Sequence, residues 1–428
     1  MGKEADKGLK DFKVGAIQVL RLIPDEELAK LAATTKVDYC AKVLTGERMF
    51  YLLVYAFVKS DRISQRKLED YFQLKPFQQL FNFVEGQKVR HSSISARLAN
   101  IDLSFFEKSF ELIYNELSKE YTEEEIAGYN LVRVDSSMVS EACNKLKNGM
   151  VVGRKTADGG ERKQIKYTVA FDGFSSLLAE VLTEQTDLCE NVAMPKVVLP
   201  LIKKDVNHKN LYILDRGFSS LENYDRMLLE KGKFVGRLCL GRRMETIRVV
   251  STEPKDFGQL EMVEDKWVHL YDNKEKQFSE TVYRVIHCKF KTPRDTSRKQ
   301  GGKNVKKLEN EICFITNNFD ISAEDVVFAY KKRWDIEVFF RFLKQQLCFS
   351  HFLSTSKNGI KVILYMTLIT AMLILIYKKK NETGYARAKW CFAIELETWM
   401  LVYTRYVAGL DYEHYNDKVR FRTHIPAD

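Results

Sequence analysis

The chain has 428 residues, and at about 150 residues per domain this length predicts about three domains or one large elaborated domain. Hydrophobic residues make up 45% of the chain and charged residues 29%, which excludes a disordered or collagen-like protein. There are 68 Lys and Arg residues against 58 Asp and Glu residues, so the net charge is +10. This excess favours a polyanionic partner, and nucleic acid before a membrane surface.

Residues 1–128 are predicted to form an all-α N-terminal domain. Apolar residues recur at helical spacing in the stretches 12–23, 49–58 and 105–117. Helix-start signals followed by basic residues occur at Ser64 and at Ser92. Two such helices suit DNA binding, but about 20 residues separate them, which is too many for the short turn of a helix-turn-helix motif. A helical bundle with solvated lysines is equally compatible with this part of the sequence.

Residues 129–240 have a different hydrophobic pattern, in which short strand-like runs appear between helical stretches. The strand-like runs are 131–134, 167–171, 177–182 and 211–214. A helical pattern such as Leu221–Lys231 lies between such runs. Strands that alternate with helices predict an α/β sheet covered by helices on both faces.

Residues 241–308 are polar and strand-like, and they are predicted to form a β-rich insertion that ends in a basic loop. Between Lys289 and Lys307 there are eight basic residues and one acid, Asp295. A run of this kind suits contacts with phosphate groups, although a merely solvated loop would have the same composition.

Residues 309–380 return to core-like patterns. A strand is predicted at 312–316, and a helix is predicted to begin at Ser322, where Asp325 completes a pattern like a capping box. Residues 381–428 are expected to form a C-terminal helical tail.

One apolar stretch, Val362–Tyr377, invites comparison with a membrane span. It has 16 residues, whereas a helix needs about 20 to cross the hydrocarbon. Lysines flank it on both sides, which gives no inside-outside asymmetry. We therefore predict a helix buried in a large core and no membrane partner.

The cysteines and the first residues indicate in which cellular compartment the protein is expected. Eight cysteines are scattered without a C-x-x-C pair, so neither a disulfide framework nor a zinc site is indicated. The first residues are polar and lack the apolar segment of a signal peptide. We expect reduced cysteines in a cytoplasmic protein.

Two aspartates directly follow strand-like runs. Asp135 follows LVRV and Asp215 follows LYIL. Open α/β sheets place their functional sites at the carboxyl ends of strands, and an unpaired acid inside the sheet would cost several kcal/mol. Either aspartate alone is weak evidence, because acids at strand ends often cap turns, but two in one domain favour a shared role.

A third acid lies on a predicted helix from Tyr330 to Lys344. At about 100° per residue, Glu337 shares a sector about 80° wide with aromatic and basic residues, beside an apolar face. The other members of this sector are Tyr330, Arg333, Arg341 and Lys344. The geometry is compatible both with a functional stripe and with a solvated stripe held by ion pairs between residues four apart.

These residues together resemble a known family. Tyr330, Arg333, Glu337 and Lys344 match Y-x2-R-x3-E-x6-K, the YREK signature of the DDE transposases of bacterial insertion sequences, specifically the insertion-sequence-four family. The sequence DRGF at Asp215–Phe218 resembles the second-aspartate motif of that family. The resemblance covers about residues 129–377, covers 1–128 only loosely, and hardly extends beyond 380.

The resemblance implies a fold and a catalytic site. The fold would be a ribonuclease-H-like mixed sheet with flanking helices, its two parts at 129–240 and 309–380 interrupted by the β-rich insertion and preceded by the all-α domain. Asp135, Asp215 and Glu337 would be the catalytic, metal-binding acids. Tyr330, Arg333 and Lys344 would contact the phosphates of DNA.

The resemblance also implies a reaction and its partners. A pair of Mg²⁺ ions, with Mn²⁺ able to substitute, suits phosphodiester cleavage by three carboxylates. The enzyme would bind the terminal inverted repeats of an insertion sequence, cleave at the ends and join the 3′ ends to target DNA. It would act as a homodimer on paired ends and associate with the nucleoid. The alternatives are a domesticated ribonuclease-H-like nuclease and a non-catalytic DNA-binding protein, and the three intact acids argue against the second.

Overall fold

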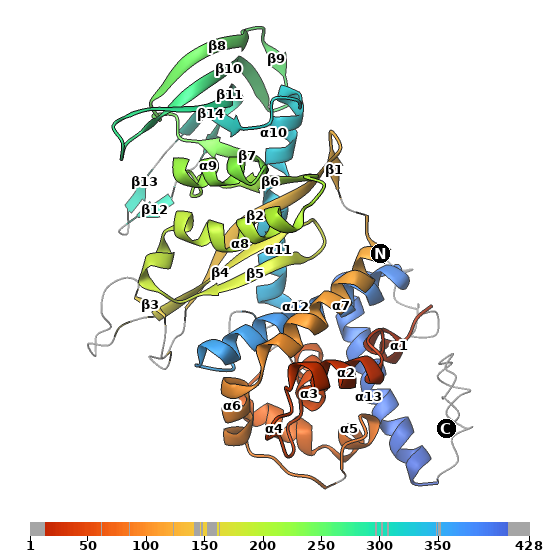
Figure 1. The fold of residues 1–428 in the computed structure, drawn as a ribbon. Helices are drawn as coiled ribbons and strands as arrows, with labels where there is room; N and C mark the ends of the chain where they lie inside the picture. The colour runs from red at the N-terminus through yellow and green to blue at the C-terminus, as the bar shows by residue number, and fades with distance from the viewer. Residues whose placement is uncertain are drawn as a thin grey trace.

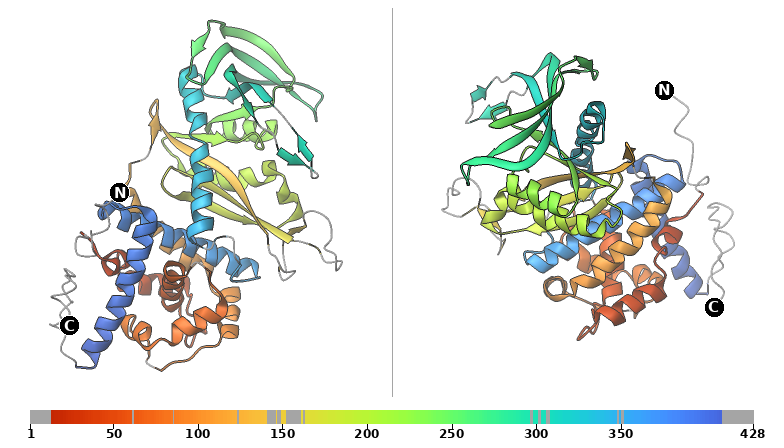
Figure 2. Two further views of the ribbon diagram at one scale, coloured as in Figure 1. Left: turned by 180° about the vertical axis from the view of Figure 1, so that it is seen from behind. Right: turned by 45° about the horizontal axis from the view of Figure 1, so that its top comes forward.

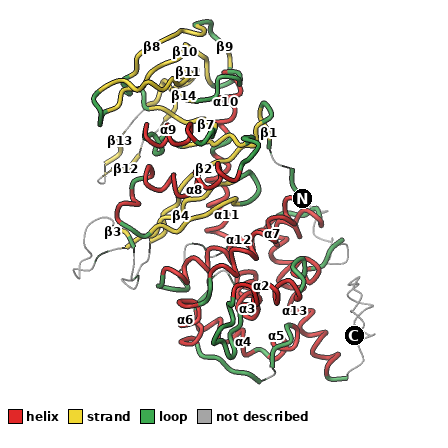
Figure 3. The backbone as a smooth tube through the Cα atoms, in the orientation of Figure 1, coloured by secondary structure: helices red, strands yellow, loops and turns green. Residues whose placement is uncertain are grey.

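A computed structural model describes residues 13–409 apart from short gaps, and it has a helical body and a body built on a large sheet (Figure 1). The residues outside the description are 1–12, 61, 85, 123, 141–145, 147–148, 152–160, 162, 296–297, 301–302, 306–307, 348, 350–351 and 410–428. Figure 3 shows that helices make up the lower body, whereas most strands lie in the upper body.

The helices have these bounds. Helices α1 to α7 span Ala16–Leu20, Asp25–Thr35, Gly46–Lys59, Gln65–Gln73, Lys75–Leu80, His91–Asn100 and Leu103–Glu120. The 3-10 helix η2 spans Gln185–Leu188, and α8 and α9 span Glu190–Lys204 and Leu221–Leu229. Helices α10 to α13 span Ala323–Lys331, Trp334–Gln346, Lys357–Lys380 and Tyr385–Val407.

The strands fall into two groups along the chain. Strands β1 to β7 span Glu125–Ile126, Tyr129–Ser140, Met150–Val151, Lys163–Phe171, Ser176–Leu182, Asn210–Leu214 and Lys233–Leu238. Strands β8 to β14 span Met244–Ser251, Lys255–Asp256, Leu260–Asp272, Gln277–Asp295, Arg298–Gln300, Lys303–Val305 and Leu308–Thr316.

Five strands form the part of the sheet that carries the predicted aspartates, in the order β5-β4-β2-β6-β7. Strands β5, β4 and β2 pair antiparallel, whereas β2, β6 and β7 run parallel. The parallel strands are buried on both faces, which explains why Leu211–Leu214 is apolar throughout. The predicted α/β class, a mixed sheet with flanking helices, is confirmed.

The two faces of this sheet are covered by different helices. Val132 and Val134 of β2 share a core with α8 and α9, whereas Leu131 shares a core with α10. Since side chains alternate along a strand, Arg133 and Asp135 lie on the face of Leu131. Asp135 therefore lies on the face of the sheet that is turned toward α10 and α11, the helices of the YREK residues.

The strands of the predicted insertion continue the same sheet. Strand β14 pairs with β7 on one side and with β11 on the other, and β10 and β8 follow. The prediction of a basic loop is wrong for residues 289–295, which extend β11 as a strand. There Lys289 pairs with Glu311, and Arg294 pairs with Glu309, so opposite charges face each other across the strands. Part of the predicted loop, at 296–297, 301–302 and 306–307, lies outside the described residues.

Helices from both ends of the chain share one core in the lower body. Residues of α1 to α7 cluster there with residues of α12 and α13. Figure 2 shows α12 and α13 among the N-terminal helices from both directions. As predicted, a helix starts at Ser64, whose hydroxyl accepts a hydrogen bond from the Lys67 amide at 3.2 Å. The predicted N-terminal domain and C-terminal tail are therefore packed together.

The apolar stretch 362–377 belongs to the longer helix α12. Helix α12 has 24 residues and is long and apolar enough to cross a membrane, so the argument from a length of 16 residues does not hold. However, 78% of an apolar stretch of 18 residues in this helix is buried inside the protein. The helices that pack against α12 include α3, α7 and α13. The structure thus places α12 in the interior of the helical body.

The prediction of one continuous helix from Tyr330 to Lys344 is wrong. Helix α10 ends at Lys331 and α11 begins at Trp334. At the junction, the buried Arg133 Nε donates a hydrogen bond to the Lys332 carbonyl at 3.3 Å. A side chain that inserts into the helical hydrogen-bond ladder is a common cause of a kink. Positions counted along one straight helix therefore do not carry over from α10 to α11.

Candidate active site

Asp135 and Asp215 are neighbours at the point where two parallel strands part. The ladder between β2 and β6 ends at the pair Val134 and Leu214, and each aspartate is the next residue. The prediction that Asp135 ends its strand is wrong, because β2 continues to Ser140 through pairing with β4. Asp215 does follow its strand, and its carbonyl accepts a hydrogen bond from the Phe218 amide at 2.9 Å.

Arg333 joins the three predicted acids. Its Nη2 lies 2.6 Å from Glu337 Oε1, its Nη1 lies 3.6 Å from Asp135 Oδ2, and its Nε lies 3.7 Å from Asp215 Oδ1. Three acids far apart in the sequence are thus gathered around one guanidinium. The side chain of Arg333 is only 16% exposed, so solvent screens these contacts little.

The environment of Asp135 disfavours its charge. Burial raises the pKa of Asp135 to about 7, helped by the nearby carboxylates of Asp215 and Glu190. The Ser136 amide, which donates to Asp135 Oδ1 at 2.7 Å, and Arg333 act in the opposite direction. Burial is the largest cause of the rise in the pKa, and the neighbouring carboxylates add to it.

The other predicted residues differ in how close they lie to the acids. The Tyr330 hydroxyl donates a hydrogen bond to Asp215 Oδ1 at 3.2 Å, and burial together with Asp215 raises its pKa. Lys344 lies two turns beyond Glu337 on α11 and is half-buried, which lowers its pKa. Within the described part of the chain no ion pair of Lys344 is seen. Tyr330 and Arg333 therefore join the acids, whereas Lys344 stands apart.

The donor set fits a hard divalent cation by its chemistry, since it offers carboxylate oxygens alone. Among the described residues, however, no three acid, histidine or cysteine side chains already stand close enough to hold an ion. The Arg333 guanidinium occupies the place between the acids and stands in for a cation. An ion bound by the three acids would therefore require Arg333 to move.

Two residues of the site escaped the sequence-based prediction. Arg133 is fully buried and donates to the carbonyls of Leu131 and Asp172, both at 3.0 Å, as well as to Lys332. The feature of the sequence that could have revealed Arg133 is its position between two valines in a strand that was predicted to be buried. Glu190 begins α8 beside Asp215, and nothing in its local sequence distinguishes it.

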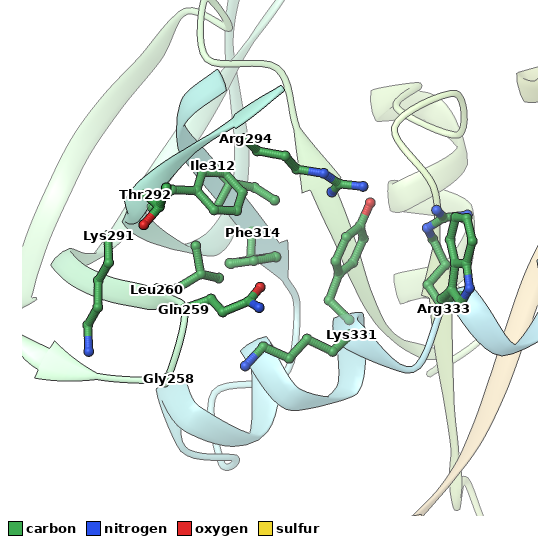
Figure 4. Close-up of a pocket in the computed structure, with 13 residues that line it drawn as sticks. Gly258, Gln259, Leu260, Lys291, Thr292, Arg294, Ile312, Phe314, Lys331 and Arg333 are labelled. Carbon is green, nitrogen blue, oxygen red and sulfur yellow. The ribbon is translucent and has the colours of Figure 1, made fainter. Parts of the chain in front are cut away.

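A cavity of about 740 Å³ is lined in part by Arg333, which contacts the acids (Figure 4). Tyr330, Arg333 and Trp334 line its helical side, and Trp334 is 48% exposed there. The strand side combines apolar and basic residues, namely Leu260, Phe290, Lys291, Arg294, Ile312 and Phe314. Figure 4 shows Arg294 approaching from the strands and Lys331 from the helix. The cavity thus offers apolar and aromatic surface together with positive charge.

Comparisons with known proteins identify the family. The model of the transposase DDE domain matches residues 61–373, well over half of the chain. A probable transposase for insertion sequence element IS5377 from Geobacillus stearothermophilus is 24% identical over 332 residues, covering 74% of this chain and 78% of that protein. The putative transposase y4zB from Sinorhizobium fredii (strain NBRC 101917 / NGR234) is 22% identical over 172 residues, covering 40% of this chain and 43% of that protein.

A solved structure of the piggyBac transposase synaptic complex with hairpin DNA is similar at a TM-score of 0.43 and 12% identity, covering 96% of this chain and 86% of that one. This likeness is too distant to carry an argument. The family match is sufficient: the chain belongs to the DDE transposase family. It is accordingly an enzyme of DNA cleavage and strand transfer.

Proposed function

We propose that the chain is the transposase of a bacterial insertion sequence of the YREK type, the insertion-sequence-four family. It binds the terminal inverted repeats of its element, cleaves at the ends and joins the 3′ ends to target DNA. Asp135, Asp215 and Glu337 are its catalytic acids. The strand order is β5-β4-β2-β6-β7. Strands β5, β4 and β2 pair antiparallel, and β2, β6 and β7 pair parallel, which supports a ribonuclease-H-like core.

One observation carries this proposal. Arg333 lies within 3.7 Å of a carboxylate oxygen of each proposed acid. The acids come from β2, the loop after β6, and α11, so only the fold brings them together. A solvated stripe of helix ion pairs, the alternative for Glu337, does not explain why Asp135 on β2 and Asp215 after β6 share the same partner.

The acids would hold two Mg²⁺ ions, with Mn²⁺ able to substitute. When bound, such ions activate the attacking oxygen and stabilise the leaving oxygen of an in-line displacement. Asp135, Asp215 and Glu337 supply the oxygen ligands and fix where the scissile phosphate lies. Arg333, freed from the acids, donates to a phosphate oxygen in the bidentate manner that guanidinium favours.

The DNA would lie across the cavity beside the acids. Its basic residues suit the phosphate backbone, and the exposed Trp334 with Phe290 suits a base that leaves the stack. Tyr330 and Lys344 would also contact phosphates of the DNA. The helical N-terminal part would bind the terminal repeat, since α4 and α6 contact each other and begin near basic residues.

The enzyme would act as a homodimer, because two element ends must be held together for joining. A basic chain with a net charge of +10 that acts on chromosomal DNA would work in the cytoplasm, associated with the nucleoid.

The test uses DNA that carries two matched terminal repeats, together with Mg²⁺. We expect Asp135→Asn, Asp215→Asn and Glu337→Gln each to reduce cleavage by about 10²-fold or more, as loss of a preorganised charge-stabilising group does. End binding, measured by gel shift, is expected to remain. Glu222→Gln, an exposed residue on α9, is the control that should keep full activity.

The outcomes test the assignment of each acid and the proposed reaction separately. Cleavage that persists in one of the three variants removes that acid from the site. Cutting without joining by the wild-type protein contradicts the proposed transposition reaction and favours a nuclease. Joining of 3′ ends to a target plasmid supports it.

A further inference from the structure

The residues at the break between α10 and α11 do not explain the break. The four residues from Lys331 to Trp334 include neither glycine nor proline, the residues that most often interrupt a helix. The backbone of Lys332 and Arg333 keeps right-handed helical angles, and no side chain caps the start of α11. A contact from elsewhere in the fold therefore determines where α10 ends and α11 begins.

Arg133 of strand β2 makes that contact. Its Nε donates a hydrogen bond to the Lys332 carbonyl at 3.3 Å, and its Nη2 lies 3.3 Å from Asp335 Oδ2. These two contacts lie on either side of Arg333 in the chain. Glu337 follows Asp335 by two residues on α11. The places of Arg333 and Glu337 therefore depend on where Arg133 holds the junction.

The side chain of Arg133 is itself held on all sides. It has no exposed surface, and its Nη1 donates to the carbonyls of Leu131 and Asp172, both at 3.0 Å. Its Nη2 also pairs with Glu124, whose other carboxylate oxygen lies 2.6 Å from Lys332 Nζ. All three nitrogens of the guanidinium are thus engaged. Because the guanidinium is planar and rigid, it transfers the position of β2 to the junction.

Arg133 and Asp135 lie on the same strand and on the same face of the sheet. Two residues of a strand span about 7 Å, and β2 is paired with β4 on one side and with β6 on the other. The strand that carries the first proposed acid therefore also holds the helix that carries the third. A change in the contacts of Arg133 would move Glu337 relative to Asp135.

We propose that Arg133 is a positioning residue of the catalytic centre, which sets the distance of Arg333 and Glu337 from Asp135 through the Lys332 carbonyl and Asp335. This inference rests on the proposed function, because it assumes that Asp135 and Glu337 act together. It assigns a role in the reaction to a buried residue outside the YREK signature.

The first experiment compares cleavage with binding for Arg133→Lys, which keeps the charge but lacks the three-way fork. The rate constant of single-turnover cleavage is measured with Mg²⁺ and DNA that carries a terminal repeat, and the affinity for this DNA is measured by gel shift. We expect the rate constant to fall about 10²-fold, the cost of misplacing a reacting group by about 1 Å. The affinity should stay as in the wild type.

A destabilised variant away from the site is the control for a purely structural role. Glu395, a buried residue of the helical body, accepts hydrogen bonds from the Ala16 amide and the Tyr377 hydroxyl. Glu395→Gln should lower the melting temperature but cleave as the wild type does at temperatures where it is folded. If Arg133→Lys and Glu395→Gln lose cleavage to the same degree, Arg133 only stabilises the fold and the inference is overturned.

The second experiment changes the partner of Arg133 at a more exposed position. The side chain of Asp335 is 44% exposed, so Asp335→Asn should fold, and it decides the question alone if Arg133→Lys does not fold. We expect Asp335→Asn to slow cleavage about tenfold, as loss of a supporting partner does. Glu324→Gln, with the same change of charge at an exposed position of α10, should keep the full rate.

The double variant shows whether the two residues act through one contact. Arg133→Lys and Asp335→Asn together should slow cleavage by less than the product of their separate effects. Effects that multiply would show that the two residues act independently and would contradict the inference.

The acid variants distinguish the two levels of the argument. If Asp135→Asn and Glu337→Gln abolish cleavage while Arg133→Lys or Asp335→Asn, once folded, cleaves at the wild-type rate, the inference is overturned and the proposed function stands. If the acid variants themselves cleave at the wild-type rate, the proposed function fails.

Discussion

In the proposed function, Arg333 would have two roles that cannot be performed at the same time. In the structure it balances Asp135, Asp215 and Glu337, whereas in the proposed complex it contacts a phosphate. A guanidinium and a divalent cation would compete for the same carboxylate oxygens, so binding of the ion would be coupled to release of the arginine. DNA phosphates then offer the released guanidinium a new partner. Metal binding and DNA binding should therefore strengthen each other.

Arg333→Gln tests this competition. We expect the variant to bind Mn²⁺ several-fold more tightly than the wild type, because the competitor for the acids is gone. Its affinity for DNA should fall, with a salt dependence flatter by about one unit, the loss of one phosphate contact. Calorimetry and gel shifts over a range of salt concentrations measure both effects.

The controls lie on the same helix. Arg341→Gln, at an exposed position of α11, should leave Mn²⁺ binding unchanged. Lys344→Ala should flatten the salt dependence of DNA binding without changing Mn²⁺ binding. Weaker Mn²⁺ binding by Arg333→Gln would contradict competition.

The raised pKa of Asp135 predicts a pH dependence of stability in the absence of metal. The pKa is about 7 in the folded protein against a usual value of 3.8, because the site is buried and acidic. Between about pH 4 and pH 7 the folded state holds a proton that the unfolded state has lost, so the contribution of Asp135 to stability falls as pH rises and is constant above pH 7.

Asp135→Asn removes this effect. In EDTA, the melting temperature of the variant relative to the wild type should therefore be higher at pH 8 than at pH 5, by on the order of a few degrees. Differential scanning calorimetry at both pH values measures it. A difference that does not change with pH would contradict the raised pKa.

At the scale of elements, the junction between α10 and α11 determines where Arg333 and Glu337 lie. Arg133 fixes this junction from inside the sheet, through the Lys332 carbonyl and an ion pair to Asp335 at 3.3 Å. Arg133 is also paired with Glu124. Strand β2 thus carries both a proposed catalytic acid, Asp135, and, two residues earlier, Arg133, which contacts the junction before α11.

Arg133→Met should destabilise the protein by about 3 kcal/mol or more, since it leaves buried carbonyls without donors. Arg226→Met, which removes an exposed arginine paired with Glu222 on α9, should cost less than about 1 kcal/mol. Denaturant unfolding measures both values. A similar cost for the two variants would show that the buried contacts of Arg133 contribute little.

Elements with a strong local signal were predictable. The apolar runs at 131–134 and 211–214 became β2 and β6, and Ser322 with Asp325 forms the predicted capping box. The kink at Lys332 was not predictable, because it depends on an arginine about 200 residues away.

At the scale of the whole molecule, one large sheet and one helical core hold the protein together. Helices from both ends of the chain contribute to the helical core. The sheet runs from β3 to β8 through β2 and β6, beside which the proposed catalytic aspartates lie, and through the strands of the predicted insertion. The helical core includes residues of α3, α7, α12 and α13, together with the buried face of α11. The site therefore lies where the two bodies meet, and α11 belongs to both.

This arrangement predicts that residues 1–128 do not fold alone. Without α12 and α13, the apolar faces of α3 and α7 lose their partners. We expect the isolated fragment to lack a cooperative thermal transition and to bind a hydrophobic dye. A sharp transition like that of the full chain would instead support an independent N-terminal domain.

The central claim is that Asp135, Asp215 and Glu337 form one divalent-metal centre. The most direct test is the anomalous scattering of Mn²⁺ in crystals of the protein with DNA ends. We predict Mn²⁺ within about 2.0–2.3 Å of oxygens of all three acids, with Arg333 turned toward a phosphate. Mn²⁺ bound elsewhere, with Arg333 still held between the acids in the presence of DNA, would contradict the account.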